Sequence, residues 1–338
     1  MIEIDGSYGE GGGQILRMSI AFSSITNKPV KIFNIRANRP NPGLRNQHIT
    51  AIETVAKICN AEVKGLKIGS REIEFYPGEI CGGQYEFDVG TAGSVTLVLQ
   101  ACIIPSIFAE KETKLILKGG TDVRWSPPWD YFRNVFLENL KKMGIEIEGK
   151  LHKRGYYPAG GGKIEISINP CREIKPLYFD EKFEEIEGIV HISNLPLQIA
   201  ERIKKSAEEN ISGKYPSNIR IEENEAISPG VGIVLWSKPK IIGSDCLGEK
   251  GKPAEEIGKF VAKKILEEID AGVDLDEKAV DQLLPFMAIS GSKIKFKCSD
   301  LSMHASTEIF LLKKFIDIDA KIEKNKIVEV EVEGEKLI

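Results

Sequence analysis

The sequence predicts an α+β protein with a large domain of three repeated units, each a four-stranded sheet plus two helices, and a small inserted α/β domain. Two observations support this fold class. The same order of turn, helix, strand, loop and helix recurs along the chain, and the last copy is interrupted by a long segment with elements of its own. A chain of 338 residues has room for two domains or for one large core with an insertion.

The composition, 42% hydrophobic and 28% charged, is typical of a soluble globular protein. We find neither an apolar run of the ~20 residues that span a bilayer nor a signal sequence, so we expect a cytoplasmic protein without a membrane partner. Six scattered cysteines without a C-x-x-C pair argue against zinc and leave both a disulfide and the oligomeric state open. The net charge of −4 argues against nonspecific coating of nucleic acid but allows a local basic cleft that binds one strand end.

The first unit opens with a glycine-rich turn, residues 5–13, that leads into an apolar helix beginning near Gln14. Glycines permit positive φ and the close approach of an anion, and a helix N-terminus offers free N–H groups. The turn is therefore a candidate ligand site flanked by Glu10 and Arg17, although an ordinary strand-to-helix connection has the same pattern. Neither common nucleotide-binding fingerprint fits, because no Gly-Lys-Ser/Thr follows and Gln14 replaces the last glycine of G-x-G-x-x-G.

A strand at residues 30–35 is followed by a loop, residues 36–48, that leads into a second helix. Arg36, Arg39 and Arg45 lie in this loop. Guanidinium groups and helix N–H groups both bind anions, so the loop is a candidate phosphate clamp. A solvated charged loop explains the same cluster equally well.

The second unit repeats this order of elements. Its opening turn lies at residues 87–94, its strand at 114–117, its loop at 119–128, and a helix ending near Met143 leads into a strand at 145–148.

The third unit closes the chain. Its parts are a helix at 277–287, a strand at 293–297, a loop at 298–302, a helix at 303–315, and strands at 319–323 and 327–332. We expect the loops of the three units to gather at a shared centre.

The inserted domain is predicted at residues 179–273, which leaves 1–178 and 274–338 for the large domain. The insert shows a strand and a helix, then further strands, and a final helix ending near Ala271. Acidic residues mark both the departure and the return of the chain.

His304 is the candidate for chemistry. It falls in the first turn of the last predicted helix, where the helix dipole disfavours the protonated imidazole and keeps the ring a neutral nucleophile. A lone histidine is nevertheless more often structural than catalytic.

Six motifs occur in the order found in RNA 3′-terminal phosphate cyclases, and the chain resembles that family over essentially its whole length. The motifs lie at residues 10–17, 36–48, 90–94, 157–162, 279–284 and 304–307. Several motifs in register are far more specific than any one of them. The fold implied by the resemblance, three repeated units and a small α/β insert, agrees with the repeats seen in the sequence.

The resemblance implies an enzyme that uses ATP to convert an RNA 3′-terminal phosphate to a 2′,3′-cyclic phosphodiester, releasing AMP and pyrophosphate. His304 would be the nucleophile and would form a histidine–AMP intermediate. The partners would be RNA 3′-phosphate ends and ATP. Mg²⁺ or Mn²⁺ would neutralise the triphosphate, with Glu10 as the carboxylate beside the metal ion.

The other site residues implied by the resemblance form two groups. Those that would hold phosphates of RNA or ATP are Arg17, Arg36, Arg39 and Gln47. Those of the nucleotide pocket are Gln100, Pro127, Lys278, Asp281 and Gln282, with Pro127 packing on adenine. Two positions depart from the family pattern. Lys278 replaces a common aromatic ring that stacks on the base, and Glu308 replaces a common amide, which would add negative charge near the nucleophile.

Three other function classes remain open. A pure RNA-end binding protein would need the basic loops without His304. A non-catalytic, RNA-binding ribosome-assembly relative would share the fold but is expected to lack the histidine. An enolpyruvyl-transferase-like enzyme has similar repeated units but needs no adenylylated histidine. The presence of His304 favours the cyclase reaction.

Overall fold

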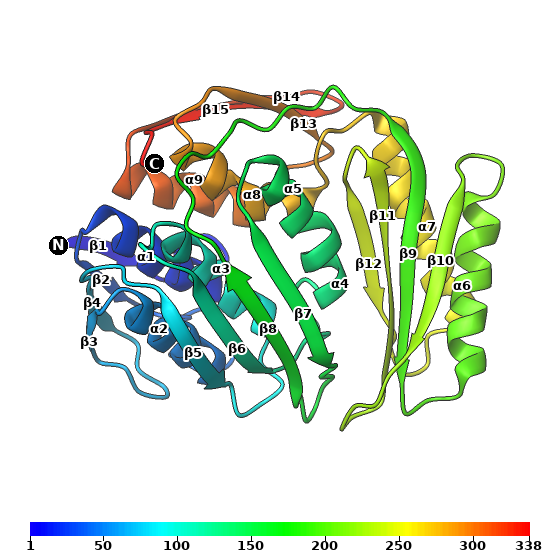
Figure 1. The fold of residues 1–338 in the computed structure, drawn as a ribbon, viewed down its shortest axis with the longest axis horizontal. Coiled ribbons are helices and arrows are strands. Elements are labelled where there is room, and N and C mark those ends of the chain that lie inside the picture. The colour runs from blue at the N-terminus through cyan, green and yellow to red at the C-terminus, as the bar shows by residue number, and fades with distance from the viewer.

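Four β-sheets and the helices packed against them make up the computed structural model, which describes residues 1–338 (Figure 1). Three sheets belong to the repeated units and one to the inserted segment, as the α+β prediction required. In the view of Figure 1 the inserted segment forms the right-hand side of the molecule, and the third unit lies across the top.

The first unit has a sheet with the strand order β1-β2-β4-β3, in which β1 and β2 are parallel and the other pairs antiparallel. Its elements are β1 (Ile2–Asp5), α1 (Gly13–Thr26), β2 (Val30–Phe33), α2 (Asn46–Ile58), β3 (Glu62–Lys64) and β4 (Ile73–Tyr76).

The second unit has the same topology, β5-β6-β8-β7, again with the first pair parallel. Its elements are β5 (Gly83–Asp88), α3 (Val95–Ile107), β6 (Thr113–Gly119), a helix made of α4 (Trp129–Tyr131), a π-helical stretch (Phe132–Leu137) and α5 (Glu138–Lys142), then β7 (Ile147–Lys153) and β8 (Gly162–Ile168). The shared strand order confirms that the sequence repeat is a structural repeat.

The third unit differs from its prediction, because its sheet has three strands, β13-β15-β14, and not four. Its elements are α8 (Glu277–Ile289), β13 (Ile294–Cys298), α9 (Met303–Phe315), β14 (Ile318–Lys324) and β15 (Val328–Gly334).

The missing strand is explained by the insertion. Phe179 packs against Phe296 of β13 as the chain leaves for the insert, but no ladder forms there. The returning chain bonds β13 at a single point, because the amides of Asp274 and Leu275 both donate to the carbonyl of Lys297. The chain turns into α8 directly afterwards, which leaves no length for a strand.

One apolar core of 69 buried residues runs through all three units. Helix α3 is apolar on almost every side and is buried among α1, α2 and its own sheet, which is where a helix without a polar face belongs. Helix α9 packs against both α1 and α8 in the same interior. This packing brings the N-terminal ends of helices from different units together.

The inserted segment has a second core of 20 buried residues, all between Ile186 and Val273. Its sheet order is β10-β9-β11-β12, and α6 and α7 cover one face of the sheet. The elements are β9 (Phe183–Ser193), α6 (Leu197–Ile211), β10 (Ser217–Glu223), β11 (Gly230–Pro239), β12 (Gly243–Leu247) and α7 (Ala254–Ala271). The domain boundaries at residues 179 and 273 stay a prediction.

A buried ion cluster joins the second unit to the insert. Arg154 is fully buried and its guanidinium donates to Asp122 at 3.2 Å, to Asp130 at 2.8 Å and to Glu222 of β10 at 3.0 Å. Burial lowers the pKa of Arg154, but the carboxylates of Asp122 and Asp130 more than offset that effect, so the pKa is raised and the guanidinium stays charged.

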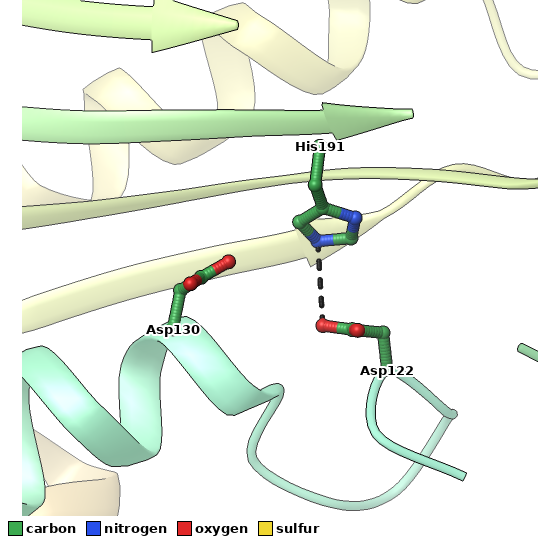
Figure 2. A group of neighbouring side chains, drawn as sticks. All are labelled: Asp122, Asp130 and His191. Carbon is green, nitrogen blue, oxygen red and sulfur yellow. Dashed lines mark ion pairs between the residues drawn. The ribbon is translucent and has the colours of Figure 1, made fainter. Parts of the chain in front are cut away.

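His191 of β9 faces the same cluster (Figure 2). Its Nε2 lies 3.5 Å from Oδ1 of Asp122, and its Nδ1 lies 2.8 Å from the hydroxyl of Tyr156. Burial lowers the pKa of His191 to about 4, so the ring is neutral at pH 7. Asp122, Asp130 and His191 have the composition of a metal site, but the Arg154 guanidinium already supplies the cation that the two aspartates need.

No helix has the length and apolar character needed to cross a membrane. All six cysteines are free thiols, so the disulfide left open by the sequence is not formed.

The ion cluster predicts a large stability effect at one arginine. Arg154→Met should lower the free energy of unfolding by about 3–5 kcal/mol, because it leaves buried carboxylates without their cation. Arg202→Met, which removes an exposed pair with Glu255, is the matched control and should cost less than about 1 kcal/mol. Urea unfolding followed by circular dichroism measures both. Equal effects of the two substitutions would contradict the structural role of the cluster.

Candidate active site

His304 lies in the first turn of α9, and the helix start is anchored to α8. The hydroxyl of Ser302, the residue before the helix, accepts a bond of 2.9 Å from the Ala305 amide and donates to the Asp281 carboxylate. Asp281 therefore fixes the start of the helix that carries His304. Burial, together with Glu277 and Asp276, raises the pKa of Asp281 to about 7.

Gln14 of α1 is hydrogen-bonded to both the backbone carbonyl and the ring of His304, and also to Glu308. Its Nε2 donates to the His304 carbonyl at 3.1 Å and to Oε1 of Glu308 at 2.9 Å. A backbone carbonyl can only accept, so the amide nitrogen of Gln14 faces that way and its Oε1 faces Nδ1 of His304, 2.6 Å away. Nδ1 must then carry the hydrogen. In a neutral imidazole this leaves Nε2 with a free lone pair.

The Nε2 atom of His304 faces Glu10 in the glycine-rich turn. Oε2 of Glu10 lies 3.6 Å from this nitrogen and 3.1 Å from Nη2 of Arg39. Glu10, Gln14 and His304 line a small cavity between the turn and α9. Burial lowers the pKa of His304, Arg17 and Arg39 lower it further, and Glu10 opposes them, with a net shift downward. The neutral, nucleophilic form of the ring is therefore favoured.

Arg17 of α1 is a buried cation without a partner. Only 5% of the residue is exposed, its Nε has no hydrogen bond, and no carboxylate forms an ion pair with it. Burial lowers its pKa to about 10, which still leaves it charged at pH 7. A buried, unpaired guanidinium is unfavourable unless an anion joins it, so this position suits an anionic ligand.

The structure shows why position 13 is a glycine. A methyl group there would lie 2.4 Å from Nε2 of His48 and 2.9 Å from a guanidinium nitrogen of Arg17. The backbone of the turn thus lies directly against these two side chains. His48 accepts a bond of 3.1 Å from the Arg45 amide at Nδ1, and burial and the nearby arginines lower its pKa to about 3. The neutral ring then presents an N–H donor at Nε2 toward the turn.

The side chains of Arg36 and Gln47 are hydrogen-bonded to the protein backbone and make no hydrogen bond to His304 or Glu10. Arg36 has a φ of 54° and donates to the carbonyls of Asn41 and Gly43 within its own loop, at 2.7 and 3.0 Å. Gln47 accepts a bond of 2.8 Å from the Ser94 amide and so joins α2 to the turn before α3. In this structure Arg36 shapes the arginine-rich loop, while Arg39 reaches Glu10.

The residues predicted for the nucleotide pocket lie on α3, α8 and the loop between β6 and α4. Pro127 is buried, and its carbonyl accepts a bond of 2.8 Å from Thr96 of α3, the helix that also carries half-buried Gln100. Gln282 is buried on α8, and its Oε1 has no partner. The ammonium of Lys278 pairs with Asp245 of β12 in the insert and lies 5.6 Å from the ring centre of Tyr131 in α4. In this structure Lys278 makes a contact between α8 and β12, and its role in the nucleotide pocket stays a prediction.

Comparison with known proteins decides the family. The family model described as RNA 3′-terminal phosphate cyclase matches residues 8–322. The chain belongs to the RNA 3′-terminal phosphate cyclase family. Membership in this family of enzymes, predicted from the motifs, is confirmed.

Three of the similar proteins show how complete the resemblance is. An RNA 3′-terminal phosphate cyclase of Pyrococcus furiosus is 49% identical over 93% of both chains. Those of Methanosarcina barkeri and Archaeoglobus fulgidus are each 45% identical, over 98% and 97% of this chain and 100% and 99% of theirs. A solved EPSP synthase from Acinetobacter baumannii aligns with 99% of this chain and 64% of its own, with a TM-score of 0.31 and 10% identity, too weak a likeness to bear on fold or activity.

Glu308 was expected to add negative charge beside the nucleophile, and its environment explains why this cyclase-family chain tolerates it. The side chain is buried, and burial raises its pKa to about 8 although Gln14 and Arg17 oppose the shift. The carboxyl is therefore largely protonated at pH 7. A neutral carboxylic acid has nearly the shape and charge of the amide that is common at this position.

Two side chains of the site were not assigned roles from the sequence. Gln14 and His48 both lie inside motifs that carried the family resemblance, so a signal was present. Their functions depend on contacts with Glu308, Arg17 and His304, which are distant in sequence or invisible in a motif.

The protonated state of Glu308 predicts a stability difference that depends on pH. The pKa of Glu308 is about 8 in the folded chain and takes the ordinary value of 4.5 in the unfolded chain. The folded protein therefore loses stability as pH rises from 4.5 to 8. Glu308→Gln removes the loss. The variant should gain roughly 3–5 kcal/mol over the natural protein between pH 4.5 and 8, measured by denaturant unfolding at several pH values. Exposed Glu53→Gln is the control, and a pH-independent difference for Glu308→Gln would contradict the assignment.

Proposed function

We propose that this chain uses ATP to convert an RNA 3′-terminal phosphate to a 2′,3′-cyclic phosphodiester through an AMP-bearing His304. The observation that carries the proposal is the orientation of the imidazole. Gln14 holds the hydrogen on Nδ1, and this leaves the lone pair of Nε2 facing the cavity beside Glu10. Family membership and the named relatives support the same reaction.

The first step forms a bond between Nε2 of His304 and the α-phosphorus of ATP, and the bond to pyrophosphate breaks. The imidazole acquires positive charge when Nε2 bonds to phosphorus. It keeps its Nδ1 hydrogen, and the hydrogen bond from Nδ1 to Oε1 of Gln14, already in place, stabilises that charge. Arg17, unpaired and charged, and Arg39 are the groups that would bind the phosphate oxygens. Arg36 acts by holding the loop in which Arg39 lies.

In the second step an oxygen of the RNA 3′-phosphate displaces His304 from phosphorus, so AMP passes to the RNA end and the imidazole is regenerated. The neighbouring 2′-hydroxyl then attacks the activated phosphate, forms the cyclic diester and expels AMP. A phosphate monoester has no adequate leaving group of its own, which is why activation with AMP must come first.

Glu10 fits a role in binding a divalent metal ion. Mg²⁺ is commonly held by one or two carboxylates together with substrate phosphates, and Glu10 is a half-exposed carboxylate next to the nucleophilic atom. A bound Mg²⁺ or Mn²⁺ would neutralise charge on the triphosphate. Gln100, Pro127, Asp281 and Gln282 are proposed to form the nucleotide pocket, and the unpartnered Oε1 of Gln282 is a free acceptor for an amino group.

The role of Gln14 gives a sharp kinetic test. Gln14→Ala should slow formation of the protein–AMP adduct by about 10²–10⁴-fold, because the tautomer and orientation of His304 are no longer fixed. Gln14→Glu keeps an acceptor for Nδ1 and should recover part of the rate. Labelled ATP followed by gel analysis measures the adduct, with His304→Ala as the blank and exposed Gln84→Ala as the control. Formation of the protein–AMP adduct by the His304→Ala variant would show that His304 is not the nucleophile.

The identity of the RNA end tests the whole reaction. An RNA with a ribose 3′-phosphate should give a cyclic end with ATP and Mg²⁺, and a 3′-hydroxyl end should stay unchanged. An RNA whose last nucleotide is 2′-deoxy with a 3′-phosphate should accept AMP but cannot close the ring, so the adenylylated strand should accumulate. Gel electrophoresis of the three reaction mixtures distinguishes the cyclic, adenylylated and unchanged strands. The absence of any ATP-dependent change would favour a non-catalytic RNA-binding role.

A further inference from the structure

Two large aromatic side chains are exposed on loops of the second unit. Trp125 is 94% exposed and Tyr157 is 77% exposed. Trp125 lies in the loop between β6 and α4, and Tyr157 lies in the loop between β7 and β8. Aromatic rings of this size are usually at least partly covered, so two of them exposed on one unit require an explanation.

Both loops pack against one turn, residues 90–94. At Gly120, which begins the Trp125 loop, a methyl group would lie 2.4 Å from the carbonyl oxygen of Ala92. At Gly160, in the Tyr157 loop, a methyl group would lie 2.7 Å from the carbonyl oxygen of Thr91. The two loops are also bonded to each other, since the Thr121 amide donates to the Gly155 carbonyl at 2.9 Å. The two loops that carry the exposed rings are therefore joined in one surface region of the second unit.

This surface adjoins the candidate active site. The Ser94 amide of the shared turn donates to Gln47, and Gln47 precedes His48, whose ring lies against Gly13 of the glycine-rich turn. On its other side, the Trp125 loop contacts the nucleotide-pocket elements, because the Pro127 carbonyl is bonded to Thr96 of α3.

The loop holds Trp125 in an outward position. Trp125 has a φ of 62°, a left-handed conformation that is strained for a bulky residue. The residues around it are tied down. The Ser126 hydroxyl donates to the Val123 carbonyl at 2.9 Å, and Arg124 pairs with Glu249 at 2.8 Å. The left-handed backbone of Trp125 and the bonds made by its neighbours thus hold the indole ring exposed to solvent.

We propose that Trp125 and Tyr157 form a stacking platform for the last nucleobases of the RNA strand whose 3′-phosphate enters the site. The inference rests on the proposed function. Single-stranded nucleic acid is commonly held by aromatic rings on which bases stack, beside cationic groups that bind phosphates. Such stacking is independent of sequence, because every base has a flat face. An open, exposed surface suits a strand that continues outward, whereas the single adenine of ATP is assigned to the proposed nucleotide pocket.

Trp125 also supplies its own optical probe. Of the three tryptophans, Trp129 is 1% exposed and Trp236 is 2% exposed, so Trp125 alone is open to solvent and to a stacking base. A base stacked on its indole should quench the exposed fraction of the emission. This signal needs neither ATP nor turnover.

The test titrates the whole protein, without ATP, with a short RNA carrying a 3′-phosphate. Quenching is expected with this RNA, and much less with the same strand lacking its last two bases but keeping every ribose and phosphate. Trp125→Phe should abolish the quenching but keep affinity in a filter-binding assay, because phenylalanine still stacks. Trp125→Ala and Tyr157→Ala should each weaken RNA binding by about 5- to 100-fold. Phe260→Ala, at an exposed ring on α7, is the matched control and should leave RNA affinity unchanged.

Two results would overturn the platform. One is equal quenching by the RNA with and without its terminal bases. The other is quenching by ATP alone together with a raised KM for ATP in Trp125→Ala. Cyclisation is measured separately in the same preparations. Base-dependent quenching without adduct formation would uphold the platform and refute the proposed reaction, while cyclisation with base-independent binding would do the reverse.

Discussion

The hydrogen bonds of Gln14 connect the first unit to the third at the point where chemistry would occur. One amide side chain bonds the ring and the carbonyl of His304 and the carboxyl of Glu308. Since α1 carries Gln14 and α9 carries the other two, the geometry of the nucleophile depends on how these helices pack. The apolar core that holds α1 against α9 therefore also sets the tautomer of the imidazole. A site built this way needs the whole large core to be formed.

Two buried arginines show how the surroundings determine the use of the same side chain. Arg154 is surrounded by three carboxylates and holds the insert against the second unit. Arg17 has no carboxylate partner, and the one acidic group that influences it, Glu308, is largely protonated at pH 7. The first guanidinium is neutralised within the protein, whereas the second keeps its charge for a ligand. The placement of the acidic side chains therefore decides which buried arginine stabilises the fold and which is available to bind a ligand.

The three units share a topology but have diverged in their loops. The same β-order in the first and second units leaves equivalent turns before α1 and α3, one lined by Glu10 and Arg17 and the other contacting Gln47. The third unit lacks one edge strand, at the place where the insertion interrupts it. It supplies His304 from the first turn of α9. Because the helices of all three units pack in one core, the loops before these helices lie near one another and contribute different residues to the same candidate site.

The sequence by itself determined the repeat, most helix positions and the family, because the period of apolar residues and short glycine or histidine motifs are local properties of a chain. The sequence also predicted His304, Glu10 and Arg39 as site residues. In the structure Oε2 of Glu10 lies within 4 Å of both Nε2 of His304 and Nη2 of Arg39. Tertiary structure alone decided the rest. The tautomer of His304, the protonation of Glu308 and the missing strand of the third sheet depend on burial and on partners as far as 294 residues away, which no local pattern encodes.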